Sequence, residues 1–169
     1  MKILIIEPYY TGSHKSWLDG FKETSSHSIK VITMKGQFWK WRMHGGAITL
    51  AKKFNSINYF PDLIIATDML DLPNFISLAR RKICGIPIVL YFHENQITYP
   101  WSKEDRDYLR NRDKHYGFIN YASALSADCI LFNSKFHMDS FFMELPKFLK
   151  QFPDHTEIET VEIIKSKSQ

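Results

Sequence analysis

The sequence predicts an α/β protein with a doubly wound, mostly parallel, Rossmann-like sheet lying between helices in three layers (α/β/α). Two observations predict this fold. Short runs of consecutive apolar, β-branched residues recur along the chain, as is typical of parallel strands that are covered on both faces. Segments with a helical pattern lie between these runs, so strands and helices alternate.

Five apolar runs are predicted to be strands, and the pattern between them predicts the helices. The strands are expected over 3–6 (ILII), 30–34 (KVITM), 63–66 (LIIA), 88–92 (IVLYF) and 129–132 (CILF). The helices are expected over 13–24, 48–55, 72–82, 103–126 and 135–143, with a further short helix between Pro146 and Pro153. Gly85 and Pro87 separate a helix from the strand that follows it, and Ser134 is a suitable N-cap for the helix after it.

The totals suit one globular domain. The chain has 169 residues, of which 44% are hydrophobic and 24% charged, as in soluble proteins with a single core. We expect the domain to span 1–155 and the polar segment 156–169 to be a tail or the start of a linker.

The cysteines and the N-terminus indicate the cellular compartment of the protein. Cys84 and Cys129 lie far apart inside apolar segments, which indicates reduced core thiols in a cytoplasmic protein rather than a disulfide framework or a metal site. The apolar stretch at the N-terminus is too short for a signal peptide or a membrane span, so no membrane association is expected.

Polar side chains follow four of the predicted strands. In an open parallel sheet, ligands bind beyond the carboxyl ends of the strands, so these residues are expected to meet at one edge. They are Glu7, Gly12, Ser13, His14, Thr67, Asp68, His93, Glu94, Asn95, Gln96, Asn133, Ser134 and His137. Among them, Gly12, Ser13, His14, Asn95, Gln96, Asn133 and Ser134 are predicted to bind substrate or donor.

Gly12 and Ser13 lie just before a predicted helix. Glycine allows a close approach of the backbone to a ligand, and the free N–H groups of a helix N-terminus favour an anion such as a pyrophosphate. The alternative is a plain strand-to-helix turn capped by Ser13, since neither the GxGxxG nor the Lys-bearing phosphate-loop pattern is present.

His93 and Glu94 are the predicted catalytic residues. A histidine at a strand end can hydrogen-bond a sugar hydroxyl or an oxygen that gains charge, and Glu94 can orient it or bind a hydroxyl. The alternatives are a buried core histidine and a glutamate that caps a turn. The "HENQ" residues would form the floor of a sugar-binding cleft and "TYPW", 98–101, its rim. Because the histidines and Glu94 lack HExxH-type spacing, no metal is expected.

A basic and aromatic segment, "KGQFWKWRMHGG", follows the second predicted strand. Cations hold phosphates and aromatic rings stack on bases, so this segment is a candidate RNA contact. Its candidate residues are Lys35, Trp39, Lys40, Trp41 and Arg42. The alternative is a loop whose tryptophans pack inward while its cations are solvated.

Several long phrases resemble one family. The phrases "IEPYYTGSH", "WKWR", "YFHENQITYP", "HYGFINYASALSADCILFNSKFHMDSF" and "PDH" are similar to those of the N-terminal domain of the tRNA-queuosine α-mannosyltransferases. That family is grouped with the family 4 glycosyltransferases of the GT-B fold. The resemblance extends over nearly the whole chain, from Lys2 to about His155.

The resemblance implies a specific function. Its members resemble retaining transferases that move mannose from GDP-mannose to the cyclopentenediol of queuosine in the tRNA anticodon, without a metal cofactor and with help from the leaving phosphate. His93 would lie beside the transferred sugar, and Gly12 and Ser13 near the donor phosphates. Turnover should therefore depend on His93 far more than folding stability does.

The GT-B arrangement requires a second domain, in the same chain or in a partner chain, that holds most of the nucleotide sugar. We therefore expect the isolated chain to transfer mannose weakly or not at all. Two alternatives stay open: a non-catalytic RNA- or nucleotide-binding module, and a family 4 glycosyltransferase with a different acceptor.

Overall fold

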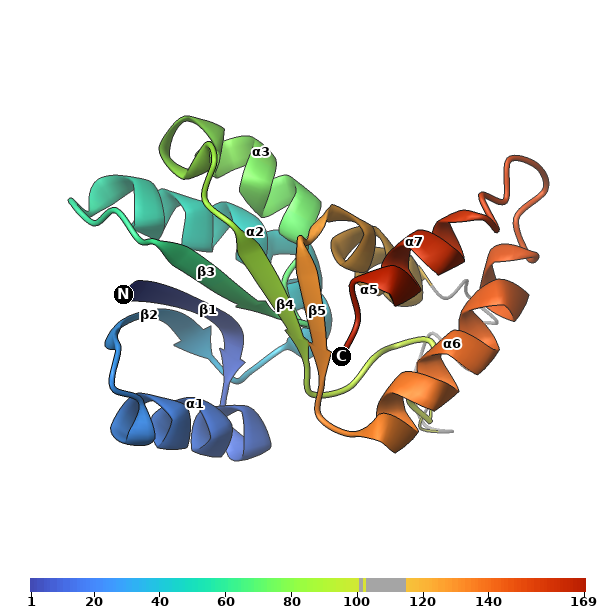
Figure 1. The fold of residues 1–169 in the computed structure, drawn as a ribbon, viewed down its shortest axis with the longest axis horizontal. Helices are drawn as coiled ribbons and strands as arrows, with labels where there is room; N and C mark the ends of the chain where they lie inside the picture. The colour runs from blue at the N-terminus through green and yellow to red at the C-terminus, as the bar shows by residue number, and fades with distance from the viewer. Residues whose placement is uncertain (101, 103–114) are drawn as a thin grey trace.

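The computed structural model describes residues 1–100, 102 and 115–169. Its sheet has five parallel strands in the order β2-β1-β3-β4-β5, which confirms the predicted α/β fold (Figure 1). The strands are β1 (Lys2–Tyr10), β2 (Ser28–Lys35), β3 (Leu63–Thr67), β4 (Ile88–Phe92) and β5 (Cys129–Phe132). All five lie where apolar runs predicted them, and β1 extends furthest beyond its run.

The helices complete three layers. They are α1 (Gly12–Thr24), α2 (Trp39–Ser56), α3 (Leu72–Ile83), α5 (His115–Ser126), α6 (Lys135–Leu149) and α7 (Thr160–Ser166). Helix α1 lies on one side of the sheet and α2 and α3 on the other (Figure 1). The chain leaves β1 toward α1 and leaves β3 toward α3, so the loops after these two neighbouring strands diverge to opposite faces. This divergence is the point at which open α/β sheets bind ligands.

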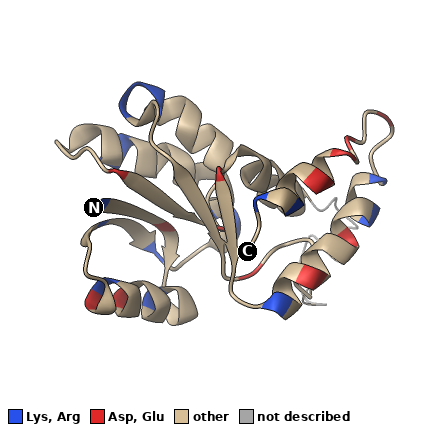
Figure 2. Ribbon diagram, in the orientation of Figure 1, with Lys and Arg blue, Asp and Glu red and all other residues tan. Residues whose placement is uncertain are grey.

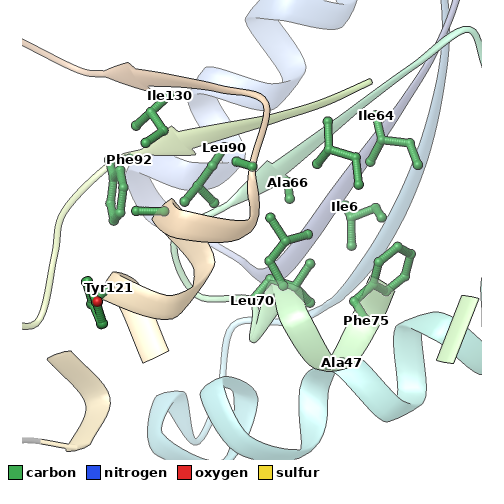
Figure 3. Packing of buried hydrophobic residues seen from close by; sticks show 14 of the residues in the cluster. Ile6, Ala47, Ile64, Ala66, Leu70, Phe75, Leu90, Phe92, Tyr121 and Ile130 are labelled. Carbon is green, nitrogen blue, oxygen red and sulfur yellow. The ribbon is translucent and has the colours of Figure 1, made fainter. Parts of the chain in front are cut away.

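The core explains why the strands read as continuous apolar runs. Side chains alternate between the two faces of a strand, and both faces of β1 are buried. Leu4 and Ile6 join the larger core beneath α2, α3 and α5, to which Phe75 and Leu90 also belong (Figure 3). Ile3 and Ile5 face α1 and pack with its Leu18 and with Ile65.

Helix α2 begins nine residues earlier than the sequence predicted. Its buried positions include Met43, Ala47, Leu50 and Phe54, whose spacing of three and four residues places them on one face of a helix. Gly45 and Gly46 hide this pattern in the sequence, although Gly46 lets the helix pack closely: a Cβ there would lie 3.5 Å from Pro8 Cβ. Residues 39–46 of the basic and aromatic segment, for which a loop was the alternative interpretation, therefore form the first turns of α2.

The end of the chain also differs from the prediction. Residues 156–169 were expected to be a polar tail or linker, but α7 buries Val161 and Ile164 in the larger core. Beyond α7, the backbone N–H of Gln169 donates to Ile130 O at 2.9 Å, and Phe132 N–H donates to Gln169 O at 3.0 Å. This segment therefore belongs to the same folded unit and runs beside β5.

Two other helices differ from prediction at their ends. Helix α6 continues through Pro146 to Leu149, because Leu145, Phe148 and Leu149 bury their side chains in the core. The first half of the helix expected over 103–126 falls on 103–114, outside the described residues, and α5 confirms the second half.

The charged residues lie away from the buried middle of the sheet. Lysine, arginine, aspartate and glutamate are concentrated on the helices and at strand ends, while the middle of the sheet is apolar (Figure 2). Across the described part of the chain, every helix is too short or too polar to span a membrane.

Candidate functional site

A cavity of about 520 Å³ opens at the carboxyl edge of the sheet. Its wall combines polar groups from two loops with a set of aromatic and apolar side chains. The polar part comes from the loop after β1 and the loop after β4: Thr11, Gly12, Ser13, His14, Glu94 and Gln96. The apolar and aromatic part includes Tyr9, Trp39, Met69, Tyr99 and Pro100. The structure thus brings together five of the residues predicted to meet at this edge, Gly12, Ser13, His14, Glu94 and Gln96, with Trp39 of the predicted RNA contact and with Tyr99 and Pro100 of the predicted rim. Trp101 of that rim lies outside the described residues.

Two glycines shape the loop between β1 and α1. Gly12 has a φ of +52°, in the left-handed region that favours glycine. Gly36, after β2, lies so close to this loop that a Cβ would be 2.1 Å from Thr11 Cγ2. The N-cap of α1 is Thr11 rather than Ser13, and its side chain makes no capping hydrogen bond within the described structure. The first N–H groups of α1 therefore remain available to a ligand.

Glu7 is the buried anchor of the site. Its side chain is 0% exposed and comes from β1, where Glu7 pairs with Thr33 of β2 and follows the last residue that pairs with β3. The backbone N–H of Tyr9 donates to Glu7 Oε1 at 2.7 Å, and His14 Nδ1 lies 3.1 Å from Glu7 Oε2. Because a carboxylate accepts, His14 must carry a proton on Nδ1. Glu7 thus fixes the tautomer and the orientation of the His14 ring.

The surroundings of His14 raise its pKa. Burial alone would lower the pKa, but the hydrogen bond to Glu7 and the carboxylates of Asp68, Glu7 and Glu94 outweigh burial. The net shift is upward from the usual histidine value. His14 therefore keeps its proton to a higher pH than an ordinary histidine does.

His93 lies behind His14 rather than in the cavity wall. Its side chain is 8% exposed and packs against His14, Trp17 and Tyr91, at ring-centroid distances of 4.0, 5.1 and 4.8 Å. Its Nε2 is 3.8 Å from Glu7 Oε2 and is the one fully buried side-chain nitrogen or oxygen without a hydrogen bond among the described residues. Burial and the charge of His14 lower the pKa of His93 to about 3. The ring is therefore neutral near neutral pH.

Asp68 is a second buried carboxyl at this edge. It follows β3, and its Oδ1 accepts from the backbone N–H of His93 at 2.9 Å. Burial raises the pKa of Asp68 to about 8, although the charge of His14 and the hydrogen bond from His93 oppose the shift. The carboxyl group of Asp68 therefore holds the loop after β4 against the loop after β3.

Asn120 was not predicted to belong to the site. Its Oδ1 accepts from Gln96 N–H at 2.7 Å, and its Nδ2 donates to Asp68 O at 2.8 Å. From a buried position in α5, Asn120 thereby connects the loop after β3 with the loop after β4. A signal exists in the sequence, because Asn120 is an amide between the apolar and aromatic residues Ile119 and Tyr121.

Glu94 and Gln96 are the polar residues of the cavity wall that come from the loop after β4. Gln96 Nε2 donates to Glu94 Oε1 at 3.3 Å. Burial raises the pKa of Glu94, opposed by the charge of His14 and by this hydrogen bond. Both side chains can hydrogen-bond hydroxyl groups of a ligand.

Asn95, Asn133 and Ser134, which were predicted to bind substrate, form hydrogen bonds that hold loops in place. Asn95 Oδ1 accepts from Ile97 and Thr98 N–H groups, and Asn133 Nδ2 donates to His93 O at 2.6 Å. Ser134 caps α6 by accepting from His137 N–H.

His137 connects these three residues. Its Nε2 lies 2.6 Å from Asn95 Nδ2, and its Nδ1 lies 3.1 Å from Asn133 Oδ1. Burial lowers the pKa of His137, so a neutral ring that donates from Nδ1 and accepts at Nε2 satisfies both contacts. None of Asn95, Asn133, Ser134 and His137 belongs to the cavity wall as far as the described residues define it.

One group of described residues has the spacing for a metal ion: Glu7, His14 and His93, whose ligand atoms lie within 4.8 Å of one another. The hydrogen bond between Glu7 and His14 accounts for two of these atoms without an ion. His137, another histidine considered as a metal ligand from the sequence, contacts Asn95 and Asn133 instead. We assign no metal to this group.

The predicted RNA-contact residues lie at the end of β2 and the start of α2. Trp39 is half-buried in the cavity wall, with its ring 5.0 Å from that of Tyr116, and Lys40 Nζ lies 5.5 Å from the Trp39 ring. Trp41 is 62% exposed, and Arg42 Nε donates to Lys35 O. The basic and aromatic surface therefore adjoins the cavity through Trp39.

Comparison with known proteins agrees with the resemblance seen in the sequence. Residues 2–169 match the family described as tRNA-queuosine alpha-mannosyltransferase N-terminal. Over 153 residues, 90% of this chain, the sequence is 35% identical to a Drosophila melanogaster protein named tRNA-queuosine alpha-mannosyltransferase, and the match spans 39% of that relative's length. With the family match over the whole described fold, the chain belongs to the family of tRNA-queuosine alpha-mannosyltransferase N-terminal domains.

Proposed function

We propose that this domain forms the acceptor side of a glycosyltransferase that moves mannose to queuosine in tRNA. The observation that carries the proposal is the pairing of the family match with a cavity at the edge of the sheet where ligands bind. The cavity offers Glu94 and Gln96 to hydroxyl groups and Trp39, Tyr9 and Tyr99 to the faces of a ring. A nucleoside that carries a cyclic diol has both features.

The same proposal includes the donor and the second domain. The donor would be GDP-mannose, transferred with retention in a GT-B arrangement, and a second domain would hold most of it. The match covers 39% of the relative's length, which leaves room for such a domain in that protein. On this side of the cleft, Gly12 and Ser13 would present backbone N–H groups to the donor phosphates, and the cytoplasm is the expected location.

The start of α2 supports binding of RNA next to the cavity. Trp41 presents its indole to solvent next to Gly45, and the adjacent Arg42 donates to the carbonyl oxygen of Lys35, so phosphates and bases of an RNA strand could both be held there. Trp39 continues this surface into the cavity wall. This surface also supports the second candidate function, an RNA-binding module without catalysis.

Titration of purified chain with tRNA tests the proposal. We expect tRNA that carries queuosine to bind more tightly than the same tRNA without the modification, and both to bind more weakly as salt rises. Equal affinity for the two tRNAs would favour the non-catalytic module. Absence of binding to either tRNA at low salt would contradict both functions.

A further inference from the structure

Resting on the proposed function, we propose that Glu94 and Gln96 act as a pair that binds both hydroxyls of a vicinal diol on the acceptor nucleoside, and so selects acceptors that carry this diol. Three structural relationships support the role: the hydrogen bond between the two side chains, the burial of Gln96, and the oxygen that each side chain keeps for the cavity. The sequence marks both residues as polar but does not show that their side chains meet.

The hydrogen bond within the pair fixes the orientation of the Gln96 amide. Gln96 Nε2 lies 3.3 Å from Glu94 Oε1, and a carboxylate accepts, so the amide nitrogen must face Glu94 and the amide oxygen must face away from it. Neither this amide oxygen nor Glu94 Oε2 hydrogen-bonds to a described residue, yet the one fully buried unpartnered atom in the described structure is His93 Nε2. Both oxygens therefore keep access to the cavity that the two residues line.

The loop that carries the pair is held by buried groups. Gln96 is 5% exposed, and its backbone N–H donates to Oδ1 of the buried Asn120 at 2.7 Å. Asn120 donates in turn to Asp68 O, and Asp68 Oδ1 accepts from the backbone N–H of His93, the residue before Glu94. The backbone of both members of the pair is thus fixed before a ligand binds, which reduces the entropy that binding costs.

The charges around the pair favour hydroxyl groups over an anion. Glu7, Asp68 and Glu94 all lie close enough to His14 to raise its pKa, so three carboxyl groups gather at this edge of the sheet. The charge of His14 and the hydrogen bond from Gln96 lower the pKa of Glu94, against the effect of burial. A carboxylate at this position repels a phosphate, whereas it accepts charge-assisted hydrogen bonds from hydroxyl groups. The proposed function places the donor phosphates at a different loop, the one after β1.

Two neighbouring acceptors suit a vicinal diol better than a single hydroxyl. A single hydroxyl would pair with one oxygen and leave the other without a partner once the ligand excludes water, which costs free energy. A vicinal diol supplies a proton for each oxygen. Hydrogen bonding leaves both protons on the diol, so no covalent bond breaks in this step. A site of this kind rejects analogues that lack one hydroxyl.

NMR of chain labelled with ¹⁵N in its glutamines tests the pair without tRNA or turnover. The probes are cis-1,2-cyclopentanediol, cyclopentanol and methyl α-mannoside, which carries the vicinal diol of the donor sugar. We expect the cyclopentanediol to shift the side-chain amide signals of Gln96 at concentrations at which cyclopentanol does not, and more strongly than the mannoside does. Gln151, which is exposed after α6, is the internal control and should not shift.

Substitution of Glu94 tests the pair from the protein side. Glu94→Gln should remove the response of Gln96 to the cyclopentanediol, because the uncharged amide is a weaker acceptor than the carboxylate. Glu144→Gln, which removes a carboxylate paired with Lys147 on α6, is the matched control and should keep the response. Gln96→Ala identifies the Gln96 signals by their loss.

Three results with the wild-type chain would overturn the inference. They are no response of Gln96 to the cyclopentanediol, an equal response to cyclopentanol, and a stronger response to the mannoside, which would assign the diol to the donor sugar. These results need no variant, so the test remains decisive even if Glu94→Gln does not fold. A folded Glu94→Gln chain that responds as wild type does would also overturn the inference.

Titration with tRNA separates this inference from the proposed function. Glu94→Gln should lower the preference for tRNA that carries queuosine by about tenfold, and should leave the affinity for the same tRNA without queuosine unchanged. An unchanged preference would overturn the role of Glu94. Absence of any preference in wild type would instead contradict the proposed function, while the diol probes would still decide whether the pair binds a vicinal diol.

Discussion

His14 and His93 pack ring against ring, with centroids 4.0 Å apart, and yet the pKa values of the two imidazoles move in opposite directions. Both rings are buried to a similar degree, so burial does not distinguish them. The difference is the hydrogen bond at 3.1 Å that His14 makes with Glu7 and that His93, at 3.8 Å, lacks. The positive charge on His14 is therefore stabilised by Glu7, and this charge disfavours protonation of the neighbouring His93 ring.

This relationship changes what substitution of His93 should do. The sequence suggested a large effect on turnover and a small one on stability, whereas the buried ring predicts a substantial loss of stability as well. We expect His93→Ala to lower the free energy of unfolding by about 2 kcal/mol or more, because it leaves a cavity in a packed site. Urea unfolding measures this, with the exposed His27→Ala as control. A variant as stable as wild type would contradict the packing described for His93.

Asp68 should make stability depend on pH. Its pKa is about 8 when folded and near 4 when unfolded, so the folded state holds more protons between these values and stability falls as pH rises. The free energy of unfolding should therefore fall less between pH 6.5 and pH 8 in Asp68→Asn than in wild type. His93 does not obscure the comparison, because it is neutral in both states over most of this range. If the free energy of unfolding changed equally with pH in the two proteins, Asp68 would be ionised in the folded state.

Gly36 should be required for the shape of the cavity wall. A Cβ there would lie 2.1 Å from Thr11 Cγ2 and 3.3 Å from Thr11 N, so the loop after β1 would have to move. We expect Gly36→Ala to cost about 1–3 kcal/mol. Gly20→Ala in α1 is the matched control, since its Cβ would meet no atom within 4 Å and helix propensity favours alanine by up to about 1 kcal/mol. Thermal unfolding of the two variants should shift in opposite directions.

Trp41 should contribute to RNA binding without contributing to the fold. Stacking of a base on an aromatic side chain is worth about 1–3 kcal/mol, so Trp41→Ala should weaken tRNA binding by about tenfold. Phe136→Ala removes a comparably exposed ring, 82% exposed, from α6 and is the control. Filter binding with both variants measures the difference. Equal affinities would remove the start of α2 from the proposed RNA surface.

The isolated chain should transfer mannose weakly or not at all. Under the proposed function a second domain positions most of the donor, and positioning supplies a large share of the rate of a two-substrate reaction. The measurement is incorporation of labelled mannose from GDP-mannose into tRNA by purified chain. Rapid turnover by the monomer would show that this domain carries the whole donor site.

The sequence by itself determined the sheet and the edge at which the polar residues after its strands lie. Runs such as 3–6 and 88–92 can be buried on both faces only within a covered parallel sheet, and polar residues after such runs must lie at its carboxyl edge. Local chemistry also suffices for Ser134, whose hydroxyl caps α6 as predicted. These features depend on neighbours in the chain, which a sequence shows directly.

Only the tertiary structure decided which polar residues face the cavity and which support it. Glu7 reaches His14 because β1 and the start of α1 fold back on each other, and His93 comes from a strand two positions across the sheet. A pKa depends on burial and on charges from all of these elements, so the pKa of the same imidazole group is raised at residue 14 and lowered at residue 93. The early start of α2 and the packing of α7 were likewise decided by burial against distant elements.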